Sequence, residues 1–133
     1  MYTLQTVVRL HDTDAAGLLF FANQFKMAHD AYESFLEHIG FSFARVLRDE
    51  DFLLPIVHAE ADYKERLRAG DRLAVRVKIE KIGDSSFVLS YDLLAAGDRS
   101  VGTVQTVHVC TDKVSGRKRP LPDDLRQALS AQS

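Results

Sequence analysis

The stretch His11-Asp12-Thr13-Asp14-Ala15-Ala16-Gly17-Leu18-Leu19-Phe20-Phe21-Ala22-Asn23 lies between a strand-like segment and a long amphipathic segment. Asp12 and Asp14 stand in its polar half, and an apolar run then leads into the predicted helix. The start of a helix carries unpaired backbone N–H groups and the positive end of the helix dipole. A carboxylate beside donors that can polarise a carbonyl is typical of a site for acyl chemistry.

The segments on either side of this stretch have different periods. Residues 2–10 alternate as a strand does, whereas Asn23 is expected to cap a helix that ends near Gly40. Residues 41–51 are expected to form a loop with at most one further helical turn. The apolar stripe of the helix comprises Phe25, Ala28, Tyr32, Phe35, Leu36 and Ile39.

Beyond residue 52 the apolar residues recur at every second position, which is typical of half-buried strands. Four strands are predicted, joined by glycine-containing turns, and a short peripheral helix is expected from Asp123 onward. Short connections favour antiparallel neighbours. The sequence therefore predicts an α+β fold, in which one long helix lies across one antiparallel five-stranded sheet.

Composition limits the classes of function. The chain has 133 residues, enough for one domain over residues 1–133, and its net charge of -2 argues against nucleic-acid binding. No apolar run reaches a membrane-spanning length, and no signal peptide is evident, so a cytoplasmic protein is expected. One helix leaves sheet edges uncovered, which predicts a homo-oligomer.

The carboxylates of Asp12 and Asp14 have two interpretations. Both are compatible with ordinary loop and capping roles, or one of them acts as nucleophile or general base toward a carbonyl. A metal site at His11 to Asp14 is disfavoured, because adjacent acids and one histidine are a weak ligand pattern. Neither a serine elbow nor a phosphate-binding glycine loop is present, and Cys110 is expected in the core.

Five histidines and one basic cluster complete the candidates. His29 and His58 are of interest only if they border the Asp14 loop, and the remaining histidines (His11, His38 and His108) are expected to be structural. Arg117, Lys118 and Arg119 form a basic run suited to phosphate groups, although an ordinary solvated loop is the alternative.

The Asp12-Thr13-Asp14-Ala15-Ala16-Gly17 segment, the apolar run, Asn23 and the element order resemble hotdog-fold thioesterases of the 4-hydroxybenzoyl-CoA thioesterase type. The resemblance implies a curved sheet wrapped around the helix, and dimers or dimers of dimers that build paired sites. It also implies a catalytic Asp14, Gly17 near the substrate, and no cofactor or metal, since coenzyme A is part of the substrate.

Within that family, residues 29–36, 51–59, 106–110 and 117–122 are most similar to 1,4-dihydroxy-2-naphthoyl-CoA hydrolases of phylloquinone and menaquinone synthesis. Phe21 stands where other acyl-CoA thioesterases carry histidine, so its backbone N–H is expected to polarise the carbonyl. The resemblance assigns His29 and His58 to the acyl ring and residues 117–119 to the nucleotide phosphates. The alternatives are 4-hydroxybenzoyl-CoA or short- and medium-chain acyl-CoA hydrolysis, and a non-catalytic acyl-CoA-binding module.

Overall fold

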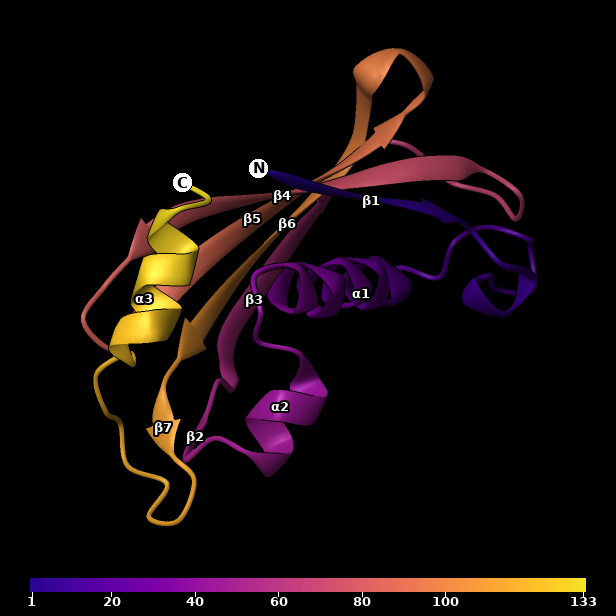
Figure 1. Ribbon diagram of the computed structural model, residues 1–133. Helices are drawn as coiled ribbons and strands as arrows, with labels where there is room; N and C mark the ends of the chain where they lie inside the picture. The colour runs from indigo at the N-terminus through magenta and orange to yellow at the C-terminus, as the bar shows by residue number, and fades with distance from the viewer.

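The computed structural model describes all 133 residues and contains a five-stranded antiparallel sheet in the order β1-β4-β5-β6-β3. Figure 1 shows the sheet curving around helix α1. The expected α+β hotdog architecture is therefore confirmed. The strands of this sheet are β1 (Tyr2–Val7), β3 (Ile56–Tyr63), β4 (Arg72–Ile82), β5 (Ser86–Ala95) and β6 (Arg99–Val109).

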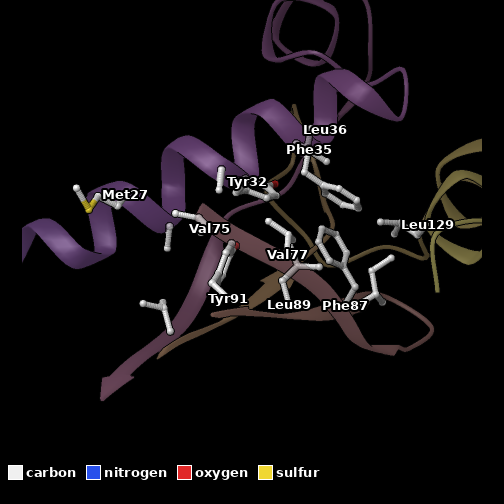
Figure 2. Packing of buried hydrophobic residues seen from close by; sticks show 14 of the residues in the cluster. Met27, Tyr32, Phe35, Leu36, Val75, Val77, Phe87, Leu89, Tyr91 and Leu129 are labelled. Atoms are coloured by element: carbon white, nitrogen blue, oxygen red, sulfur yellow. The ribbon is translucent and has the colours of Figure 1, made fainter. Parts of the chain in front are cut away.

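Helix α1 (Asn23–His38) buries one face against the concave side of the sheet. The helix contributes Met27, Ala28, Ala31, Tyr32, Phe35 and Leu36 to the core. Figure 2 shows Tyr32 and Phe35 of the helix facing residues of β4 and β5, such as Val75, Val77, Leu89 and Tyr91. Burial of one side chain of this size contributes about 1.5–3 kcal/mol, so the stripe fixes the helix on the sheet.

The start of α1 differs from the expectation. Asn23 was predicted to cap the helix, but Ala22 occupies the cap position without a side-chain hydrogen bond. Asn23 instead donates from Nδ2 to the backbone oxygen of Asp12 at 2.8 Å. This bond ties the helix to the preceding loop, where residues Leu10–Asp12 form a short 3-10 helix in place of the last residues of the predicted first strand.

Two other segments differ from the expectation. Helix α2 (Phe43–Arg48) is longer than a single turn and begins after Ser42, whose side chain accepts the Arg45 N–H at 3.2 Å. Helix α3 (Asp123–Ser130) begins at Asp123 as predicted, but it is not peripheral, because Leu125 and Leu129 are fully buried. The short strands β2 (Phe52–Leu53) and β7 (Thr111–Asp112) pair beside α2.

Strand β3 is an edge of the sheet, and almost all of it is exposed. Its two ends lie in different surroundings. The Ile56 end follows β2, while the hydroxyl of Tyr63 at the other end reaches the backbone oxygen of Phe21, two residues before α1. No helix of the chain is both long and apolar enough to cross a bilayer.

Candidate active site

The carboxylates of Asp12 and Asp14 lie in opposite environments. Asp12 is 3% exposed and accepts the Arg9 N–H at 2.9 Å and the Lys26 ammonium at 3.1 Å. Burial by itself raises the pKa of Asp12, but the Arg9 N–H and Lys26 outweigh burial and hold this pKa below its usual value. Asp12 therefore serves as an internal anchor between the loop and α1.

Asp14 is exposed, and only one of its carboxylate oxygens has protein partners. Its Oδ1 accepts the N–H groups of Ala16 at 2.8 Å and Leu18 at 3.3 Å. Gly17 closes this turn at φ 76°, a conformation that favours glycine, and donates to the Asp14 backbone oxygen at 3.0 Å. The turn holds the carboxylate in place and leaves Oδ2 for another partner.

The backbone N–H of Phe21, just before α1, has no acceptor in the protein. Its carbonyl is held at 2.9 Å by the hydroxyl of Tyr63, whose ring meets the Phe21 ring edge-on. The unpaired N–H matches the sequence-based expectation of a free donor at this position. The contribution of Tyr63 was missed, because the sequence alone does not place strand β3 beside the helix start.

Asp14 and Phe21 line the same cavity, which has a volume of about 490 Å³. The structure thus brings together the two groups that the sequence analysis placed at the centre of the chemistry. Arg66 also lines this cavity, and its positive charge beside Asp14 was not foreseen. The other lining residues are Leu18, Leu19, Phe20, Gln24, Tyr63, Glu65 and Leu67.

Gln24 fixes the first turn of α1 to the sheet. Its side chain is 2% exposed and donates from Nε2 to the backbone oxygens of Asp62 at 3.0 Å and Thr103 at 3.1 Å. A Cβ at Gly102 would lie 2.7 Å from Gln24 Oε1, so any larger residue there would displace this amide. We call this contact between Gln24 and the sheet the Gln24 clamp. Its signal in the sequence was a glutamine on the helix face that is otherwise apolar.

His29 lies on α1 and lines two adjoining cavities. One has a volume of about 440 Å³ and is enclosed mainly by apolar residues of α1, α2 and residues 53–56. The other has a volume of about 300 Å³ and opens between α1 and β3. The His29 ring lies 5.7 Å from Tyr32 and 5.9 Å from Phe43. An aromatic ligand would therefore meet aromatic walls beside an imidazole.

His58 and the basic run at 117–119 lie away from Asp14 within one chain. His58 lies 3.4 Å from Glu60, on the face of the sheet that is turned away from α1. Arg119 pairs with Asp51 at 3.0 Å, beyond β7 and far from the loop that carries Asp14 (Figure 1). A single chain thus does not unite all the residues that the resemblance assigned to substrate.

Of the groups expected to be structural, Cys110 and His108 are both fully buried. Burial raises the pKa of the Cys110 thiol, which suits a core residue. No group of three or more histidine, cysteine, aspartate or glutamate side chains is placed to hold a metal ion.

A model of the thioesterase-like superfamily matches residues 8–129. The chain belongs to this superfamily. It is 36% identical over 129 residues, which are 96% of its length and 94% of the relative's, to a Synechococcus elongatus protein named 1,4-dihydroxy-2-naphthoyl-CoA hydrolase. A Synechocystis relative of the same name is 34% identical over 129 residues, covering 96% of this chain and 94% of that one.

Solved structures agree with this membership of the thioesterase-like superfamily. The structure of a 1,4-dihydroxy-2-naphthoyl-CoA thioesterase from Synechocystis matches with a TM-score of 0.90 at 34% identity, over 97% of this chain and 95% of that chain. A gentisyl-coenzyme A thioesterase matches with a TM-score of 0.87 at 28% identity, over 96% and 99% of the two chains. The hotdog scaffold of the thioesterase-like superfamily thus extends over nearly the whole chain.

Proposed function

We propose that this protein hydrolyses an aromatic acyl-CoA thioester, 1,4-dihydroxy-2-naphthoyl-CoA, with Asp14 as the catalytic carboxylate. The observation that carries the proposal is that Asp14 and Phe21, whose backbone N–H is unpaired, line one cavity. The family membership and the names of the Synechococcus and Synechocystis relatives support the choice of substrate.

In the proposed reaction the thioester oxygen accepts the Phe21 N–H as negative charge develops on it. Removal of one such donor typically costs about 10²- to 10³-fold in rate. Asp14 Oδ2 either attacks the carbonyl carbon or removes a proton from an attacking water. Attack by Asp14 expels the coenzyme A thiolate and leaves a mixed anhydride that water then hydrolyses, whereas an activated water displaces the thiolate directly. On both routes the products are the aromatic acid and the coenzyme A thiol.

A two-fold dimer that pairs two β3 edges would complete the site. Large apolar side chains are exposed along this edge and at the start of α1, namely Phe20, Phe21, Ile56, Val57 and Tyr63. Exposed apolar groups on an unpaired strand favour addition of another strand. The homo-oligomer that the resemblance implies thus has a matching surface.

Antiparallel pairing about a two-fold axis sets the Tyr63 end of one β3 beside the Ile56 end of the other. The Asp14 cavity of one protomer then adjoins the partner subunit's His29 and, farther along, the partner's Arg117, Lys118 and Arg119. In this arrangement the acyl ring lies beside His29, and the basic run meets the nucleotide phosphates. His58, on the outer face of the sheet, takes no part in the acyl pocket.

The first test replaces Asp14 by Asn. Hydrolysis of 1,4-dihydroxy-2-naphthoyl-CoA, followed by release of free thiol, should fall by about 10³-fold or more, because the amide neither attacks nor takes up a proton. Asp30→Asn, an exposed aspartate on α1, is the matched control and should retain activity. An active Asp14→Asn enzyme would remove Asp14 from the mechanism, and a wild type that binds but never cleaves CoA esters would indicate a binding module.

A further inference from the structure

A chain of hydrogen-bonded polar groups lies in the core beneath α1. Tyr91 Oη lies 2.9 Å from Thr106 Oγ1, and Thr106 Oγ1 lies 2.8 Å from His108 Nε2. The His108 ring stacks on Phe87 with centroids 4.7 Å apart and has the Tyr32 ring 4.3 Å away. Figure 2 shows Tyr91 rising from the sheet toward the helix.

One end of this chain reaches a cavity. Tyr91 and Thr106 line the 300 Å³ space between α1 and β3, together with His29. Each hydroxyl offers one donor and two acceptor sites, so Tyr91 retains bonding capacity beyond its bond to Thr106. The remaining lining residues are Phe25, Lys26, Ile56 and Ala59.

Two polar atoms of the neighbouring rings have no hydrogen-bond partner, and one of them is fully enclosed. His108 Nδ1 is buried without a hydrogen bond. Tyr32 is 3% exposed and lines the adjoining 440 Å³ cavity, and its hydroxyl makes no side-chain hydrogen bond. The Tyr32 hydroxyl is therefore available to a ligand in that cavity, whereas His108 Nδ1 lines neither of the two cavities.

The direction of the hydrogen bonds in this chain depends on the tautomer of His108. Burial lowers the pKa of His108 to about 4, so the ring is neutral near pH 7. A neutral imidazole has two tautomers. If Nε2 accepts from Thr106, the Tyr91 hydroxyl donates to Thr106 and presents only acceptor sites to the cavity. If Nε2 donates, the Tyr91 hydroxyl is free to donate into it.

We propose that the hydroxyls of Tyr91 and Thr106 form a binding site for a ring hydroxyl of the aromatic acyl group. This inference rests on the proposed function and adds residues that determine its specificity. A site built to bond a substrate hydroxyl discriminates against the analogue that lacks it, because the buried groups are then left without their partner. The shape and apolar walls of the cavity accept the ring, while these two hydroxyls select its substituents.

The test compares 1,4-dihydroxy-2-naphthoyl-CoA with 2-naphthoyl-CoA, which lacks both hydroxyls. The measured quantity is the ratio of the two kcat/KM values in wild type, Thr106→Val and Tyr91→Phe. Each variant should lower this preference about 10-fold or more, as expected for loss of one buried hydrogen bond to the substrate. Thr106→Ser, which keeps the hydroxyl, should restore most of the preference.

Thr103→Val is the matched control, because Thr103 lies on the same strand but lines the outer face of the sheet. It should keep the wild-type ratio. Equal losses on both esters in Thr106→Val and Tyr91→Phe would show that the hydroxyls only support the fold, and would overturn the inference. If these variants do not fold, the ratio of the two kcat/KM values in the wild type is the test. A wild type with no preference for the hydroxylated ester would overturn the inference, because such an enzyme has no site that binds a ring hydroxyl. A wild type that cleaves neither ester contradicts the proposed function instead.

Discussion

At the residue scale, Asp12 and Asp14 carry the same carboxylate side chain but lie in different surroundings. Asp12 is enclosed by donors from Arg9 and Lys26, whereas Asp14 keeps one carboxylate oxygen beside a cavity. Side-chain chemistry alone does not separate these roles. The resemblance selected Asp14, and the surroundings of the two groups supply a physical reason for that choice.

A prediction at this scale concerns His108 and acid stability. The pKa of His108 is about 4 in the folded chain because of burial, below its usual 6.5, so the unfolded chain takes up this proton first as the pH falls. The contribution of the neutral His108 ring to the free energy of unfolding is therefore fully present above pH 6.5, and it is lost progressively as the pH falls toward 4. It amounts to on the order of 3 kcal/mol.

Urea unfolding at pH 7, 5.5 and 4 measures this contribution. His108→Phe keeps an aromatic ring on Phe87 and removes the titrating group, so its free energy of unfolding should fall less over this range than that of the wild type. Asp12 titrates at lower pH and contributes equally to both proteins. Parallel curves for the two proteins would contradict the assignment to His108.

At the element scale, the position of α1 depends on more than its apolar stripe. The stripe predicts which face is buried, but it does not fix where along the sheet the helix begins. Gln24 settles that position, since its amide bonds to the backbone of β3 and β6. The Asn23 bond to the Asp12 backbone adds a second tie, from the loop that carries Asp14.

Gln24→Leu should therefore reduce both stability and activity. Two backbone oxygens lose their donor, which costs about 1–3 kcal/mol, and the start of α1 beside Phe21 loses its tie to the sheet. Chemical denaturation and kcat measure the two effects. Gln127→Leu, an exposed glutamine on α3, is the matched control. A variant that lost stability but kept full kcat would show that the clamp does not position the site.

At the scale of the whole molecule, the proposed dimer is what unites Asp14 with the basic run at 117–119. Within one protomer these groups lie far apart (Figure 1). Antiparallel pairing of two β3 edges brings them to one site from two chains. The oligomer would thus be a requirement for catalysis rather than a matter of stability alone.

Subunit complementation tests this arrangement. Asp14→Asn and a charge reversal of Arg117, Lys118 and Arg119 should each be defective at low substrate concentration. Unfolded together and refolded, they should regain about a quarter of the wild-type activity, because half of the dimers are mixed and each mixed dimer has one intact site. Light scattering should report dimers or larger assemblies throughout. No gain above the average of the parents would place the whole site within one chain.

The sequence by itself determined the α+β fold, the burial of α1, and the loop that carries Asp14, because periodicity and turn residues act over short distances along the chain. It misjudged α3 and the cap of α1, since Leu125, Leu129 and Asn23 find their partners far along the chain or outside the helix. Only the tertiary structure decided where Gln24, Tyr63, Tyr91 and Thr106 lie relative to the cavities and the start of α1. Their positions depend on which strands pass beneath the helix, and that is settled by packing of the whole chain.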